Sequence, residues 1–133
     1  MNKLLSLKEI EGADSPHQKQ LDRAMKIRVP AFEFVRDVRA LAEFVGGRAE
    51  NAGLREDWAV SKEIYPGVIV HFLYYKADDE FPAVLKVLFS GDRLKMLSGE
   101  DLAGLTIACA SHMIRYIRES NPNTQLPEVC YRM

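Results

Sequence analysis

Several features that identify particular classes of protein are missing from this sequence. Its 133 residues contain only two cysteines, Cys109 and Cys130, and a chain of this length can bury a sufficient core without a disulfide. No stretch approaches the roughly 18 consecutive apolar residues of a transmembrane helix. Lys8 and Glu9 interrupt the apolar residues near the N-terminus, which argues against a signal peptide. We therefore expect a cytoplasmic protein with reduced thiols and no contact with a membrane.

The charge of the chain is almost balanced. Its lysines and arginines number 18 and its aspartates and glutamates 19, which gives a formal net charge of -1. Proteins that bind nucleic acid usually carry a basic excess, because they neutralise phosphates. The composition therefore disfavours nucleic acid as a partner.

Motifs with a defined chemical role are missing as well. The sequence has no CxxC or HxxxH spacing for zinc, and no glycine-rich loop that could hold a phosphate. Its candidate serines lack the GxSxG context of a nucleophile elbow; they are Ser61, Ser90, Ser98 and Ser111. The sequence by itself therefore predicts no catalytic residue, no metal and no cofactor.

Residues 57–90 contain the clearest structural pattern. Three strand-like runs are separated by Pro66-Gly67, which favours a tight turn, and by the acidic segment 78–80. The run 68–75 is apolar on both faces, so we expect it to be the central strand with cover on both sides. The run 58–65 has one more polar face, which is typical of an edge strand. The pattern predicts a three-stranded antiparallel meander.

Helix signals precede this meander. Ser15 is a good N-cap, with Pro16 at the first helical position and Gln18 placed to close a capping box. Pro30 is expected to end this helix and to begin a second one, which runs to about Val45 on the spacing of its apolar residues.

A last helix is expected from Ser98 to about Glu119, and residues 48–56 are expected to be a polar connection. The resulting order, α-α-β-β-β-α, indicates a single small α+β domain over residues 1–133. Residues 1–14 and 121–133 carry weaker patterns. Here the sequence leaves open whether the chain is loosely ordered, forms a short helix or lies along the body.

His71 is the first candidate for a functional site. It lies inside the predicted central strand, on the same face as Ile69 and Leu73. A histidine in such an apolar setting can act as a base or a metal ligand. The alternative is a core or interface histidine that is hydrogen-bonded to the backbone or to a tyrosine.

Two further groups contain metal-ligating side chains. His112 follows Cys109 by three residues, so both lie on one face of the predicted last helix, but zinc needs three or four ligands. The segment Asp78-Asp79-Glu80 offers oxygen ligands for magnesium or calcium, although acidic residues are also frequent in solvated turns. Metal binding at either place is the weaker hypothesis.

The surplus of apolar surface on the central strand and the last helix leads to two hypotheses of function. The first is a non-enzymatic binding or interaction protein that acts as a homodimer, because twofold dimers often cover such a surface. The second is a small-molecule-binding protein or an enzyme. Its pocket would lie between the sheet and the helices and would be lined by His71, Tyr75 and His112. The second hypothesis requires both histidines to lie on one side of the sheet.

Overall fold

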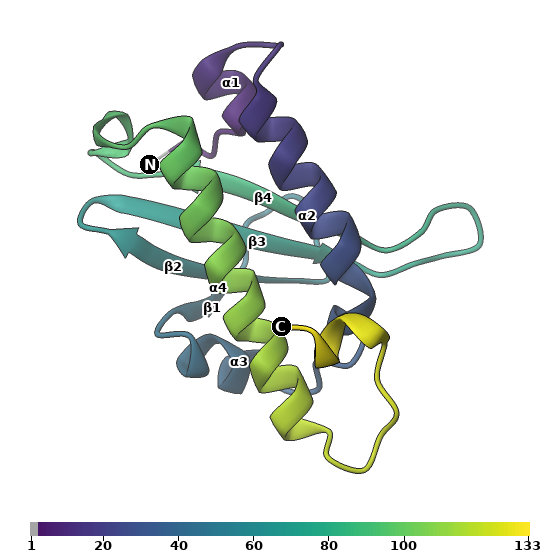
Figure 1. Cartoon of the computed structure of the whole chain (residues 1–133). Helices are drawn as coiled ribbons and strands as arrows, with labels where there is room; N and C mark the ends of the chain where they lie inside the picture. Colours follow the sequence, from purple (N-terminus) through teal and green to yellow (C-terminus); the bar gives the residue numbers. More distant parts are fainter. Residues whose placement is uncertain (1–2) are drawn as a thin grey trace.

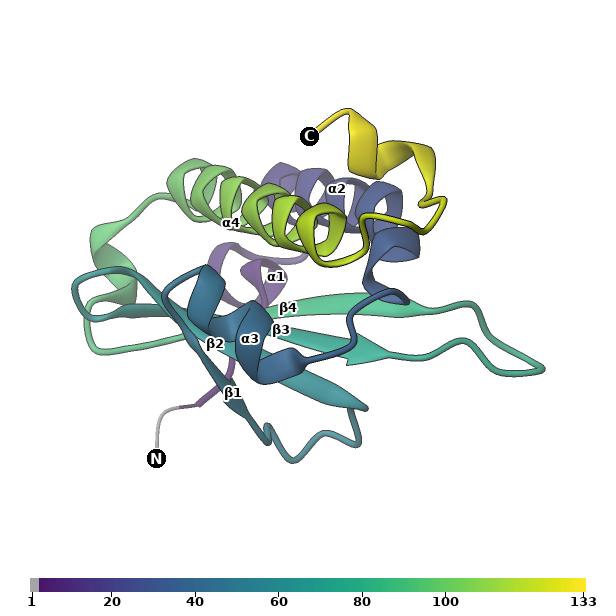
Figure 2. The same ribbon diagram turned by 90° about the horizontal axis from the view of Figure 1, so that it is seen from below.

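The protein consists of a sheet with helices on one of its faces. The computed structural model describes residues 3–133. The two long helices, α2 (Pro16–Phe32) and α4 (Gly99–Ser120), cross the same face of a four-stranded antiparallel sheet (Figure 1). In the described part of the chain, no helix covers the opposite face (Figure 2). The expected α+β class is confirmed.

The sheet has one strand more than the sequence predicts. Its strands follow one another in the order β1 (Arg48–Glu50), β2 (Trp58–Tyr65), β3 (Val68–Tyr75) and β4 (Val84–Ser90). All neighbours are antiparallel. The prediction of a three-stranded meander is therefore wrong in strand number, and β2 is not an edge strand. Strand β1 has only three residues, too few for an apolar alternation, and it forms because its backbone pairs with β2.

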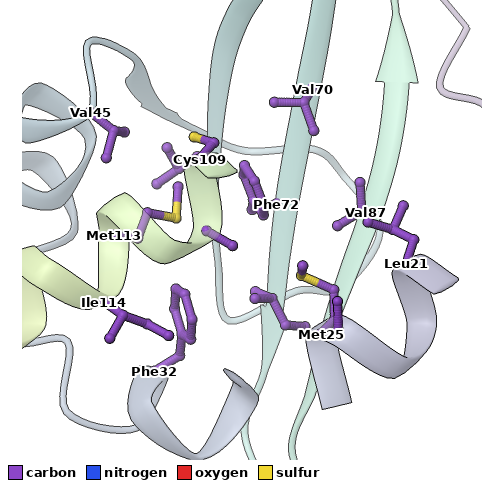
Figure 3. Packing of buried hydrophobic residues seen from close by; sticks show 14 of the residues in the cluster. Leu21, Met25, Phe32, Val45, Val70, Phe72, Val87, Cys109, Met113 and Ile114 are labelled. Atoms are coloured by element: carbon purple, nitrogen blue, oxygen red, sulfur yellow. The ribbon is translucent and has the colours of Figure 1, made fainter. Parts of the chain in front are cut away.

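Strand β3 lies between β2 and β4, as its two apolar faces predict. On the helical face, Val70 and Phe72 belong to the main core together with Met113 and Ile114 of α4 (Figure 3). On the opposite face, Leu73 belongs to a second, smaller cluster. This cluster also contains Ala59 and Leu88, and Leu4, Ala52 and Tyr75 pack against it. The N-terminal segment and the β1–β2 connection therefore supply the cover that the sequence requires.

Helix α2 continues through Pro30, contrary to the expectation that this proline ends it. The next helix, α3 (Val38–Phe44), begins only after Asp37, whose side chain accepts a hydrogen bond from the backbone N–H of Ala40. A proline inside a helix costs about 3 kcal/mol. Full burial of a side chain such as Phe32 contributes about 1.5–3 kcal/mol. Burial of the last turn therefore offsets most of the cost.

The predicted N-caps of the two long helices are confirmed. The hydroxyl groups of Ser15 and Ser98 accept hydrogen bonds from the backbone N–H groups of Gln18 and Asp101. The Gln18 side chain closes no capping box, because its Oε1 accepts instead from the backbone N–H of Lys8 at 3.1 Å.

Both ends of the described chain pack against the body. Helix α1 (Leu7–Glu11) buries Leu7, and a bridge joins Leu5 to Phe89 at the free edge of β4. After α4, the short 3-10 helix Glu128–Tyr131 buries Cys130, and Arg118 donates to the Cys130 carbonyl at 3.0 Å. Another 3-10 helix, Leu94–Met96, precedes α4. Residues 1–2, part of the N-terminal segment whose order was left open, lie outside the described residues.

The described helices include none that is both long and apolar enough to cross a membrane.

Candidate functional site

The face of the sheet that carries no helix, here called the open face, combines apolar and polar side chains. Strand register places Arg48, Ser61 and His71 directly opposite one another on β1, β2 and β3. The next row beyond His71 pairs Ile69 of β3 with Ser90 of β4. Because side chains alternate along each strand, all of these residues project from the open face.

A hollow of about 680 Å³ lies over these residues. His71, Ser61 and Ser90 are buried and line it. Arg48, Lys62, Glu50 and Glu63 bring two charges of each sign to its wall, and Leu4 is among its apolar lining residues. The hollow is therefore lined mainly by polar and charged side chains, with Leu4, Ala52 and Ile69 as its apolar ones.

The imidazole of His71 is hydrogen-bonded at both nitrogens. Its Nδ1 lies 2.6 Å from Oε2 of Glu50, and its Nε2 lies 2.7 Å from Oγ of Ser90. A carboxylate accepts hydrogen bonds but does not donate them. Nδ1 therefore carries the proton donated to Glu50, and in the neutral ring Nε2 accepts from the Ser90 hydroxyl. The two bonds hold the ring in one orientation and one tautomer.

The three side chains differ in exposure. His71 is 7% exposed and Ser90 is 3% exposed, whereas the side chain of Glu50 retains 25% of its accessible surface. The carboxylate therefore remains partly solvated, while the histidine and the serine lie at the base of the hollow. This arrangement places the charge where water can reach it and directs its hydrogen bond inward.

The β1–β2 connection closes one side of this site. Glu56 accepts hydrogen bonds from the backbone N–H groups of Ala52 and Leu54, which holds the connection in a compact turn. Tyr75 donates its hydroxyl to the Leu54 carbonyl at 2.8 Å. Burial, followed by the charge of Glu56, raises the pKa of Tyr75 above its usual value. Tyr75 shares the open face with His71 but supports the connection and does not line the hollow.

His112 lies on the other side of the molecule. It is exposed on α4, its ring centroid is 4.8 Å from that of Phe44, and it lines a shallow depression with Cys109 and Ile64. His71 and His112 are thus separated by the sheet. The pocket between sheet and helices that they were expected to share with Tyr75 is not formed in residues 3–133. The physical reason is that the main core fills that space.

The residues considered for metal binding lie in surroundings that do not favour a metal ion. Burial raises the pKa of the Cys109 thiol to about 11, which disfavours the thiolate that a metal requires. The Asp78 carboxylate accepts hydrogen bonds from the backbone N–H groups of Glu80 and Phe81 in its own turn. Within the described chain, no three His, Cys, Asp or Glu side chains are placed to hold a metal ion.

Sequence reasoning missed two members of the site, Glu50 and Ser90. Glu50 lies in the segment expected to be a polar connection, and Ser90 lacks the elbow motif of a nucleophile. Strand alternation offered a partial signal for Ser90. In the structure His71 pairs with Leu88 of β4, and Ser90, two residues further along β4, projects from the same face. Nothing in the sequence indicates that Glu50 reaches across β2 to His71.

The fold and the site together describe a two-layer α+β protein with a polar hollow on the helix-free face of its sheet. The model of one family, described as a domain of unknown function (DUF3786), matches residues 1–112, so the chain belongs to this family. The matched range includes Glu50, His71 and Ser90. No curated protein and no solved structure matches the chain.

Proposed function

We propose that this protein binds a small polar molecule in the hollow on the open face, and that His71 is the central group of the binding site. The observation that carries this proposal is the His71 imidazole, which is held by Glu50 and Ser90 at the base of a hollow of about 680 Å³. A ring held at both nitrogens is oriented before any ligand arrives, which reduces the entropy lost on binding.

The surroundings of His71 support this interpretation over a purely structural one. Two residues after His71 on the same face of β3 lies Leu73, which is fully buried against Ala59 and Leu88. An apolar residue at position 71 would extend that cluster without any polar group to satisfy. The chain instead places a histidine and a serine there, beside open space. Such a polar group favours a ligand with hydrogen-bonding atoms.

The charges around the hollow limit the kind of ligand. Its charged side chains are Arg48, Lys62, Glu50 and Glu63. Lys62 donates to the Val45 carbonyl, and Glu50 and Glu63 accept from His71 and from the backbone N–H of Gly67. Arg48 is exposed in the same cross-strand row as His71. A guanidinium group suits a carboxylate or a carbonyl oxygen. We therefore expect ligands with an oxygen acceptor for Arg48 and a donor group for the hydroxyl oxygen of Ser90, which His71 holds in place.

Nuclear magnetic resonance tests this proposal. Acetate, acetamide and ethyl acetate are added at millimolar concentration to ¹⁵N-labelled protein, and amide shifts are mapped onto the sequence. We expect at least one probe to shift residues of β1, β3 and β4 around the hollow, and His71→Gln to weaken its binding at least fivefold. The matched control is His112→Gln, an exposed histidine on the helical side, which should leave binding unchanged. Shifts that gather elsewhere, or binding that survives His71→Gln, would contradict the proposal.

A second candidate function is the homodimeric interaction module expected from the sequence. The surplus apolar surface of β3 supports this candidate less than expected, because Leu4, Ala52 and Tyr75 cover the second face of that strand. A different observation favours it: the connection between β3 and β4 extends beyond the body of the molecule (Figures 1 and 2) and carries Phe81, which is 66% exposed.

Sedimentation equilibrium at micromolar concentration tests this second candidate. A dimer that dissociates on Phe81→Ser would support it, since loss of an anchoring aromatic residue weakens an interface. A monomer at all concentrations would contradict the homodimer.

A further inference from the structure

We propose that Ser90 is a nucleophile and that the hollow hydrolyses small carboxylic esters through an acyl-Ser90 intermediate. This inference rests on the pocket proposed above and assigns it a reaction. It starts from the order of the hydrogen bonds: Glu50 Oε2 to His71 Nδ1 at 2.6 Å, then His71 Nε2 to Ser90 Oγ at 2.7 Å. Both distances lie in the range required of an orienting group, a general base and a nucleophile.

The hydrogen bond of His71 selects one of two nearby serines. Ser61 is the residue directly opposite His71 on β2, and it is buried and lines the hollow as well. The Nε2 atom nevertheless bonds to Ser90, which lies one row further along on β4. A hydroxyl bonded to a neutral imidazole nitrogen can lose its proton to that nitrogen as it attacks. Ser90 is therefore the activated hydroxyl of the pair.

Acylation follows from these positions with all atoms accounted for. The Ser90 Oγ forms a bond to the carbonyl carbon of the ester, and its proton passes to His71 Nε2. The bond from that carbon to the alcohol oxygen then breaks, and His71 returns the proton to the departing alcohol. Glu50 accepts the Nδ1–H bond throughout and stabilises the charged ring without taking the proton itself.

Deacylation repeats the same proton transfers with water. A water molecule attacks the acyl carbon, His71 takes one of its protons, and the bond from the acyl carbon to Ser90 Oγ breaks. The proton then returns to Ser90 and the carboxylic acid leaves. The reaction consumes one ester and one water, and no oxidant, reductant or metal takes part in any step.

The walls of the hollow favour an ester as the substrate. Arg48 projects from the same face as His71 and lines the hollow on its β1 side, where its guanidinium group can hold an acceptor oxygen of the substrate. The alcohol of an ester leaves more readily than the amine of an amide, so an ester demands less activation from the site. The hollow, of about 680 Å³, has room for a small ester.

Labelling with a fluorophosphonate tests this inference directly, because the reagent forms a covalent bond with activated serines. The whole chain is incubated with the reagent, the adduct is counted by intact mass, and its position is found by peptide mapping. We expect one adduct, on Ser90, and no adduct at that site in Ser90→Ala. The labelling rate should fall by about 100-fold or more in His71→Gln, because a positioned base contributes roughly 10²–10⁴ in rate. Ser120→Ala, at an exposed serine on α4, should label like the unaltered chain.

Several outcomes would overturn the inference. They are a folded chain that gives no adduct, an adduct on another residue, or labelling of Ser90 that His71→Gln leaves unchanged. If His71→Gln does not fold, Glu50→Gln provides the same test, with labelling slowed because the ring loses its charged partner. Hydrolysis of p-nitrophenyl acetate, followed by absorbance, should be lost with Ser90→Ala in parallel with labelling.

The failure of this inference can be distinguished from failure of the pocket itself. If acetate or acetamide shifts the amides around the hollow but Ser90 is not labelled, the nucleophile is disproved and the binding site stands. If neither probe binds and Ser90 is not labelled, both proposals fail.

Discussion

At the scale of single residues, burial and hydrogen-bond partners together decide the chemistry that a side chain can perform. Cys109 and His112 are three residues apart on α4, yet Cys109 is buried and His112 is exposed. Ser61 and Ser90 are both buried, yet the hydrogen bond of His71 goes only to Ser90. A residue's partner and its access to water, rather than its presence in the sequence, decide what it can do.

Cys109 provides a prediction about pH. Burial raises its pKa from 9.0 to about 11 in the folded chain, so the unfolded chain loses this proton at a lower pH than the folded chain does. The stability contributed by the neutral thiol is fully present below pH 9 and is lost as the pH rises from 9 to 11. A shift of this size corresponds to about 2–3 kcal/mol.

Urea unfolding at pH 8 and pH 11 measures this effect. Between these values the unaltered chain should lose about 2–3 kcal/mol more unfolding free energy than Cys109→Ala does. The variant is the matched control, because every other titrating group is shared. Equal losses in the two proteins would show that the thiol is not buried as described.

At the scale of elements, the sequence predicts what is local and misses what is made by pairing. The strand boundaries of β2 and β3 and both long-helix caps follow from alternation, turn residues and serine caps, and all agree with the structure. Strand β1 could not be predicted, because its three residues form a strand only through their register with β2. The end of α2 was misplaced, because local proline chemistry was weighed without the burial of Phe32.

The site follows the same division. The sequence singles out His71 as a candidate because a histidine on an otherwise apolar strand is visible. Glu50 and Ser90 lie 21 and 19 residues from it, and no local pattern reports contacts at such separations. His112, expected beside His71, lies on the helical side instead, and the sequence does not tell which face of the sheet the helices cover.

The cap of α4 gives a prediction at this scale. The Ser98 hydroxyl accepts from the backbone N–H of Asp101 at 3.1 Å. Removing it in Ser98→Ala should lower the unfolding free energy by about 1 kcal/mol, measured by urea denaturation. Ser98→Asn is the matched control, because asparagine caps helices as well as serine does, and it should change stability by less than about half as much. Equal losses in both variants would mean that the cap contributes through something other than its hydrogen bond.

At the scale of the whole molecule, the two faces of the sheet have different roles. One face supports the main core with α2 and α4 (Figure 3). The open face combines a small apolar cluster around Leu73 with the polar hollow around His71. Covering the apolar part with the N-terminal segment and the β1–β2 connection leaves the polar part accessible from solvent. This division leaves a main core on one face and a polar hollow on the other.

The cover on the open face can be tested through stability. Leu73 is fully buried although no described helix lies over it. Leu73→Ala should therefore cost about 2–4 kcal/mol of unfolding free energy, as in a main core. Ile69→Ala, on the same strand and face but only half-buried, should cost less than about 1.5 kcal/mol. A cost for Leu73→Ala no larger than that for Ile69→Ala would show that the second face is poorly covered.

The state of the His71 ring is the central claim, because both proposals depend on it. Long-range ¹H–¹⁵N correlation spectroscopy of the histidine side chains at neutral pH reports which ring nitrogen carries the proton. The account predicts that neutral His71 carries its proton on Nδ1 and that Glu50→Gln alters this signal, while the signals of His112 stay unchanged. A neutral His71 protonated on Nε2, or a signal that Glu50→Gln does not affect, would contradict the hydrogen-bonded arrangement of Glu50, His71 and Ser90.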